Sequence, residues 1–256
     1  MRPEDIEALE RGYEAWNRGE LDAVVDLVDP ALEWSPGADS PEAGVFTGRD
    51  GFIDFVRSWA ESFADFRLEP EEINVEGEHA IVTVRQSGRG RGSGIELDIG
   101  TIHVWHIRDG VAQAWSAYRT KAEAQAAIAR ETATRSYDAF NRGDIESALA
   151  AFDPEVEWQT YIVPGPGGGV YHGHAGVREL WSEAKRIFGE FRNVPEEMFH
   201  AQDKLLVYVR IEGVGAKSGA PVEARIAHLH TFRDGKVVLV RSFGDRDEAQ
   251  RAAGLV

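Results

Sequence analysis

The chain has 256 residues, and its 44 acidic and 28 basic side chains give a formal net charge of -16 at pH 7. Nucleic acids and anionic membranes bind basic surfaces, so this charge argues against both as partners. Cysteine is absent, which removes disulfides, thiolate nucleophiles and cysteine-ligated metals. The acidic N-terminus lacks the apolar stretch of a signal peptide and no segment is long and apolar enough to span a membrane, so we expect a cytoplasmic protein.

The first part of the chain predicts three helices. Apolar residues recur every three or four positions over residues 6–16, then over residues 21–28, where Asp-Pro ends the pattern. A third stripe follows Gly48 and runs from Phe52 to Phe63. Between the second and third helices, residues 32–34 predict a short strand, followed by a Pro/Gly-rich loop.

The next part of the chain predicts an antiparallel meander. Residues 80–85, 95–107 and 111–118 are rich in β-branched and aromatic side chains, and Arg-Asp-Gly between the last two is a hairpin signal. Helices followed by a meander indicate an α+β domain whose helices cover one face of a curved sheet.

The whole pattern occurs twice. Residues 13–20 recur as 137–144 at an offset of 124, and residues 108–110 recur as 233–235 at an offset of 125. We therefore expect two domains, residues 1–124 and 125–256, with net charges of -13 and -3. This difference fits either a solvated acidic face or two copies with unequal functions. Residues 120–142 contain neither Gly nor Pro, which favours a helical junction over a flexible linker.

Three motifs carry a family resemblance: the Asn-Arg-Gly-(Asp/Glu) turn and the (Phe/Tyr)-x-Gly-x-x-Gly helix start, which occur in both copies, and the closing Phe-Arg-Asp-Gly-Lys hairpin of the second copy, of which Arg-Asp-Gly recurs. Together they resemble the SnoaL-like branch of the NTF2-like superfamily. The resemblance implies two cystatin-like cone domains, each with about three helices on a curved antiparallel sheet and an apolar pocket between them. Because such domains commonly dimerise through the outer sheet face, it also implies an intrachain pseudo-dimer. We expect the chain to be a monomer of this kind, and further oligomerisation stays open.

The superfamily includes ketosteroid isomerases, polyketide cyclases and epoxide hydrolases, so its catalytic positions can be compared with this chain. The resemblance places His228 where the isomerases carry an oxyanion-hole acid, and His103 is its counterpart in the first copy. Histidine there could donate a hydrogen bond or act in acid–base chemistry, or it could be a buried ring satisfied by a neighbour.

The family's catalytic aspartates are missing. Trp34 and Trp158 occupy the position of the isomerase base, and Ala117 and Ser242 that of the last-strand acid. Tryptophan cannot abstract a proton, so steroid-type isomerisation is not expected, and whether the chain is an enzyme stays open.

Arg210 and Glu212 resemble the Arg-x-Asp pair of the epoxide hydrolases. Glu212 could orient or charge the His228 imidazole, which would make the second copy the better candidate for chemistry. An ordinary cross-strand ion pair is the alternative use of the two residues.

No cofactor or metal is expected. Two His-x-His sequences, at 172–174 and 228–230, are joined by no acidic residue at firm ligand spacing. The glycine-rich stretches at 88–94 and 165–169 lack a phosphate-binding ending and predict a hairpin and a pocket lip.

The expected pockets are aromatic, as the binding of a small apolar ligand requires. Tyr13 could join them or belong to the core, as could Tyr208, and a packed core without a cavity is the rival interpretation. The expected ligand-binding residues are Trp34, Trp105, Trp115, Arg119, Trp158, Tyr161, Tyr208, His230 and Phe232.

Two functions follow from these residues. The first is binding of a small hydrophobic, oxygen-bearing molecule. The alternative is a polyketide-cyclase-, isomerase- or epoxide-hydrolase-like enzyme using His228 with Arg210 and Glu212, and with His103 as the related group of the first copy. One half could also serve only as a scaffold for the other.

Overall fold

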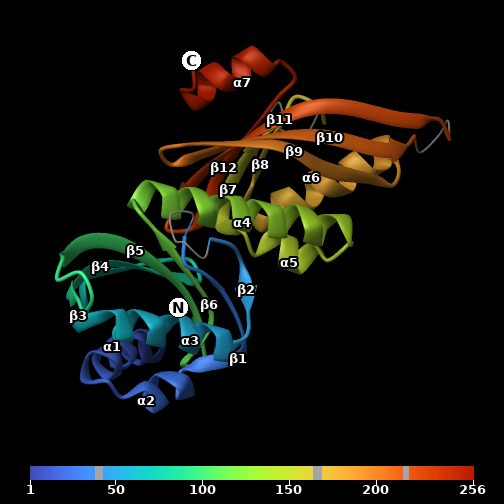
Figure 1. The fold of residues 1–256 in the computed structure, drawn as a ribbon. Helices are drawn as coiled ribbons and strands as arrows, with labels where there is room; N and C mark the ends of the chain where they lie inside the picture. The colour runs from blue at the N-terminus through green and yellow to red at the C-terminus, as the bar shows by residue number, and fades with distance from the viewer. Residues whose placement is uncertain (38–42, 164–168, 216–218) are drawn as a thin grey trace. The chain divides into compact units, whose positions relative to one another are not determined.

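The computed structural model describes residues 1–37, 43–163, 169–215 and 219–256. They form two compact units, Met1–Gln125 and Ala126–Val256, each with helices and one six-stranded sheet (Figure 1). The predicted α+β class with two similar domains is thereby confirmed. The Pro/Gly-rich loops expected after the first strand of each copy lie largely outside the described residues.

The first unit begins with helices and ends with the sheet. Its strands lie in the order β2-β1-β6-β5-β4-β3. Strand β1 pairs with β6 in parallel, and the other pairings are antiparallel. The elements are α1 (Pro3–Arg18), α2 (Leu21–Asp26), β1 (Val28–Ser35), β2 (Phe46–Thr47), α3 (Arg49–Ser62), β3 (Phe63–Glu76), β4 (His79–Gly90), β5 (Glu96–Arg108) and β6 (Val111–Tyr118).

The second unit repeats this order, with one more helix at its end. The sheet order β8-β7-β12-β11-β10-β9 is that of the first unit. The elements are α4 (Lys121–Asn141), α5 (Ile145–Leu149), β7 (Phe152–Gln159), β8 (Val170–His172), α6 (Gly173–Phe188), β9 (Phe191–Ala201), β10 (Lys204–Val214), β11 (Pro221–Arg233), β12 (Lys236–Phe243) and α7 (Arg246–Ala253). Helix α4 runs through the junction of the repeats, as the absence of Gly and Pro predicted.

Two features of the sheets differ from the sequence-based expectation. The sheets are mixed, because the first strand of each unit pairs in parallel with the last. In addition, Phe63 starts strand β3 instead of ending the third helix. The register of β3 shifts between Ala64 and Arg67, where Asp65 has a φ of 55°. This irregularity interrupts the alternation by which a strand is recognised in sequence.

The Asn-Arg-Gly motif connects the first helix of each unit to its sheet. Gly19 and Gly143 adopt left-handed φ angles of 75° and 80° at the helix ends. The Asn17 side chain bonds both backbone groups of Leu68 on β3, at 2.7 and 2.9 Å. Asn141 bonds both backbone groups of Asn193 on β9 at the same distances. The motif thus recurs because it fixes the helix against the edge strand.

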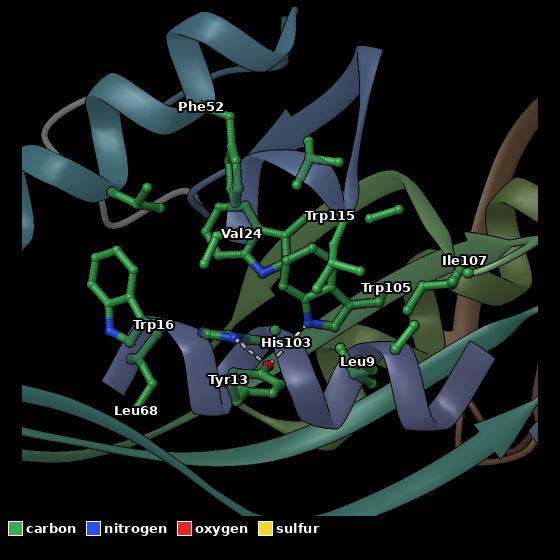
Figure 2. Close-up of a pocket in the computed structure, with 17 residues that line it drawn as sticks. Leu9, Tyr13, Trp16, Val24, Phe52, Leu68, His103, Trp105, Ile107 and Trp115 are labelled. Atoms are coloured by element: carbon green, nitrogen blue, oxygen red, sulfur yellow. Dashed lines mark hydrogen bonds between the residues drawn. The ribbon is translucent and has the colours of Figure 1, made fainter. Parts of the chain in front are cut away.

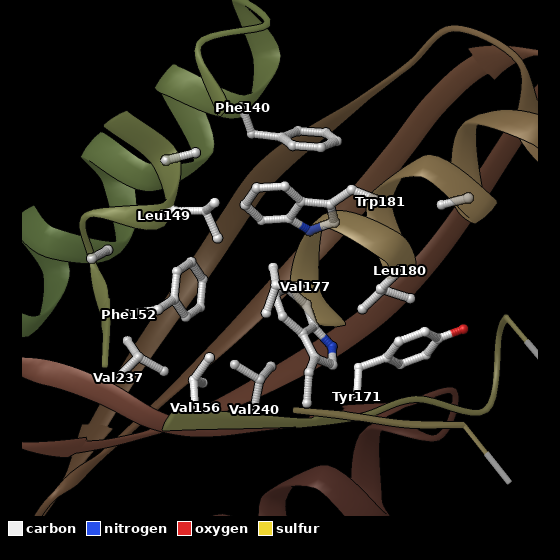
Figure 3. Close-up of a cluster of buried hydrophobic side chains, with 14 of the residues drawn as sticks. Phe140, Leu149, Phe152, Val156, Tyr171, Val177, Leu180, Trp181, Val237 and Val240 are labelled. Carbon is white, nitrogen blue, oxygen red and sulfur yellow. The ribbon is translucent and has the colours of Figure 1, made fainter. Parts of the chain in front are cut away.

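The core of each unit lies between its long helices and the inner face of its sheet. In the first unit, α1 and α3 contribute Leu9 and Phe52 to a cluster with Val82 of β4. In the second unit, Trp181 of α6 packs against Phe140 of α4, with ring centroids 5.0 Å apart (Figure 3). Helix α7 covers the outer face of the second sheet through a separate apolar cluster.

Candidate functional site

The first unit contains a cavity between its helices and the inner face of its sheet (Figure 2). The cavity has a volume of about 80 Å³. Tyr13 and Trp16 of α1 line it from one side, and His103 and Trp105 of β5 and Trp115 of β6 line it from the sheet. Strand alternation places His103 and Trp105 on the same face, as the sequence predicted.

The polar groups of this cavity are joined in a small hydrogen-bonded set. Tyr13 Oη lies 2.9 Å from His103 Nδ1 and accepts a hydrogen bond of 3.0 Å from Trp105 Nε1. The Gln86 side-chain amide lies 3.4 Å from the other ring nitrogen of His103. Burial lowers the pKa of His103 to about 3 and raises the pKa of Tyr13. Both rings are therefore neutral at pH 7, and the set can offer hydrogen bonds but no charge.

The second unit has a related set with a second histidine. Tyr137 Oη lies 2.8 Å from His228 Nδ1 and 3.1 Å from His230 Nε2. Burial lowers the pKa of His228 to about 4, and burial together with His228 lowers the pKa of His230 to about 3. A phenol has one hydrogen, so Tyr137 donates to one ring and accepts from the other.

Ser242 is the direct neighbour of His228 across strands β11 and β12. It accepts a hydrogen bond of 3.2 Å from Trp158 Nε1. In the first unit, Ala117 is the cross-strand neighbour of His103. The positions where the family resemblance implies a last-strand acid therefore lie beside the histidines, but neither carries a carboxylate.

Arg210 and Glu212 lie on the opposite face of the sheet from His228. His228 pairs with Val207, whose side chain belongs to the inner core, so both point to the inner face. Side chains alternate along a strand, and Arg210 and Glu212 lie an odd number of positions after Val207, so they point to the outer face. Arg210 forms ion pairs with Glu196, at 2.7 Å, and with Glu212. The structure does not bring the pair to His228. Arg210 has the cross-strand role of the alternative interpretation, toward Glu196 of β9, whereas Glu212 pairs with Arg210 along β10.

The remaining predicted residues divide between the inner face and the surface. Trp34, Trp158 and Phe232 contribute to the inner clusters. Tyr208 lies on the outer face, where the Arg246 guanidinium stands 3.9 Å from its ring centroid. Tyr161 is 59% exposed and lines an open groove with Arg241 and Ser242, and Arg119 is exposed.

The sequence predicts the histidines but not their partners. It suggests Tyr13 only as a possible lining or core residue, and it does not single out Tyr137. The available signal is recurrence: Tyr13 recurs as Tyr137 at an offset of 124, and His103 recurs as His228 at an offset of 125. Gln86 carried no such signal, because its counterpart is Ile211.

Within residues 1–37, 43–163, 169–215 and 219–256, no three His, Asp or Glu side chains gather in a way that could hold a metal ion. His172 is exposed at the surface, and His174 Nε2 lies 3.1 Å from the Phe152 carbonyl oxygen. Among the helices of the described ranges, none has the length and apolar character needed to cross a bilayer.

The sequence matches the family model of the SnoaL-like domain twice, over residues 9–115 and 133–240. No curated protein matches it. An NTF2-like protein of unknown function from Burkholderia pseudomallei is 26% identical, covering 48% of this chain and 95% of its own, with a TM-score of 0.42. TerC co-crystallised with polyporic acid is 26% identical, with coverages of 50% and 98% and a TM-score of 0.41. A putative polyketide cyclase from Sinorhizobium meliloti is 20% identical, with coverages of 44% and 93% and a TM-score of 0.36.

Proposed function

Since the chain belongs to the SnoaL-like domain family in both of its halves, we propose that its first unit binds a small, neutral, mainly apolar molecule. The observation that carries this proposal is the cavity of about 80 Å³ left between Tyr13, His103 and Trp115. An apolar cavity of about 150 Å³ can bind benzene. The cavity here has about half that volume, so the expected ligand is smaller than benzene, with roughly three or four non-hydrogen atoms.

The lining supports a neutral ligand. Among the described residues that surround the cavity, none is Asp, Glu, Lys or Arg, and burial keeps the His103 ring neutral. An ion buried there would lose its hydration without gaining an opposite charge. The aromatic walls supply contact area, and the few polar groups orient the bound molecule.

Filling the cavity tests this proposal. Ala112 lines it from β6, so Ala112→Leu is expected to abolish binding of a small probe such as acetone, followed through the indole N–H resonances. Ala8→Leu fills the same space from α1 and replaces the first variant if that one is unstable. The matched control is Ala23→Leu, at an exposed position of α2. Unchanged binding in a folded, cavity-filled variant would refute the proposal.

Acid–base catalysis in the second unit is a second candidate, of the polyketide-cyclase, isomerase or epoxide-hydrolase type. It is supported by the hydrogen bonds of Tyr137 to both buried imidazoles and by Ser242 beside His228. In addition, His230 Nδ1 is buried without a hydrogen-bond partner among the described residues. Arg210 and Glu212 take no part in this candidate, because they lie on the other face.

The catalytic candidate is tested with polyketide- and epoxide-like substrates. If it is right, His228→Gln abolishes turnover and leaves ligand affinity unchanged, whereas His172→Gln, at an exposed ring, changes neither. Failure of the wild-type protein to turn over any member of the panel would eliminate this candidate without affecting the binding proposal.

A further inference from the structure

Two indole nitrogens of the cavity wall, those of Trp16 and Trp115, take no part in the hydrogen bonds described above. Trp115 is 6% exposed, and its Nε1 is buried without a hydrogen-bond partner among the described residues. We infer that the Trp115 indole N–H selects ligands that carry a hydrogen-bond acceptor, such as a ketone, ester or ether oxygen. This inference rests on the proposed binding function and specifies its ligand.

The other polar groups near His103 satisfy one another. Tyr13 Oη accepts the Trp105 N–H and, beside a neutral imidazole, can donate its own hydrogen to His103 Nδ1. The remaining ring N–H then faces the Gln86 amide, whose oxygen and nitrogen can exchange places by a flip of the side chain. These groups need no ligand, so they give no preference for an acceptor.

The position of the Trp115 nitrogen favours a ligand in the cavity. The Trp115 and His103 rings meet edge to face, with centroids 5.3 Å apart. Figure 2 shows the nitrogen edge of Trp115 turned toward His103 and Tyr13. A buried N–H without an acceptor is unfavourable, and a ligand oxygen placed beside it would remove that penalty.

Two other buried indole nitrogens in the first unit also have no partner among the described residues, those of Trp16 and Trp34. Trp34 is not among the residues that line the cavity. Trp16 does line it, but in Figure 2 its nitrogen lies on the side of the ring toward Leu68 and away from His103. Of the two lining tryptophans with an unpartnered nitrogen, Trp115 is therefore the one whose nitrogen is turned toward His103 and Tyr13.

This donor distinguishes the two copies. At the offset of 125, the counterpart of Trp115 is Val240, which has no polar side-chain atom. Trp105, which bonds Tyr13 in the first unit, is replaced by His230. The acceptor preference therefore belongs to the first unit, and it excludes both hydrocarbons and carboxylates as preferred ligands, the latter because the lining has no cation.

Two probes of nearly equal shape test the inference. Acetone and isobutene share two methyl groups on a planar carbon and differ in carrying C=O or C=CH₂. One net hydrogen bond predicts that acetone binds about threefold to tenfold more tightly. The Trp115 indole proton resonance is expected to move downfield with acetone and not with isobutene.

Trp115→Phe removes the N–H and retains an aromatic wall. The variant is expected to bind both probes with equal affinity, whereas the control Trp59→Phe, at an α3 position outside the lining, keeps the wild-type ratio.

Equal affinities in the wild type would overturn the inference and leave the binding proposal intact. Loss of selectivity in Trp16→Phe in place of Trp115→Phe would also overturn it. If neither probe binds the wild type, the binding proposal itself fails. The wild-type affinities and resonance shifts decide the question even if Trp115→Phe does not fold.

Discussion

Mild acid is expected to destabilise the first unit through His103. The ring is 3% exposed, and burial lowers its pKa from 6.5 to about 3. Below pH 6.5, the His103 ring is therefore protonated in the unfolded chain, whereas it stays neutral in the folded chain. A depressed histidine pKa means that the folded state is favoured above pH 6.5 and loses this advantage as the pH falls toward 3.

The size of the effect follows from the difference in proton binding. Each pH unit below 6.5 costs about 1.4 kcal/mol of unfolding free energy, so the loss reaches about 2 kcal/mol at pH 5. Because the pKa of His103 in the folded chain lies well below 5, this loss depends mainly on the pKa of the same ring in the unfolded chain. It is a substantial part of the 5–15 kcal/mol that typically stabilises a domain.

Urea unfolding of the wild type and His103→Gln at pH 7, 6 and 5 measures this contribution. The difference between their unfolding free energies is expected to shrink by about 2 kcal/mol from pH 7 to pH 5. The control is His172→Gln, whose ring is 71% exposed and contacts water in both states. A difference for His103→Gln that stays constant over this range would show that the folded protein accepts the proton, contrary to the reasoning.

Three further outcomes are expected. Asp5→Asn should destabilise the first unit by about 1–3 kcal/mol in urea unfolding, because the buried carboxylate accepts the backbone N–H groups of Arg2 and Gly110. Although burial alone raises the pKa of Asp5, these bonds and the Arg2 side chain lower it to about 2, so its contribution is present above pH 3.8 and fades as the pH falls toward 2. Glu212→Gln should change stability by less than about 1 kcal/mol and leave probe binding unaltered in the same resonance assay, since its ion pair is on the outer face. In sedimentation, the chain should behave as a monomer of 28.3 kDa, and a larger species would contradict the expectation drawn from the repeat.

The sequence predicts which side chains share a face of the sheet within one strand, but not between strands. Within one strand, alternation fixes which side chains share a face, and His103 with Trp105 follows that rule. Between strands, the relative face depends on register, which the sequence pattern does not state. This is why Glu212 was grouped with His228 although the register of β10 and β11 places them on opposite faces.

By itself, the sequence determined the duplication, the α+β class, the helical junction and the histidine retained in both copies, because periodicity and internal repetition are local properties. Only the tertiary structure decided that Tyr13, far from His103 in the chain, is its hydrogen-bond partner. It also decided that a cavity remains beside them and that the Trp115 N–H has no partner among the described residues. A cavity is the space left after all surrounding side chains are packed, so its volume and its unsatisfied donors are set by many distant residues together.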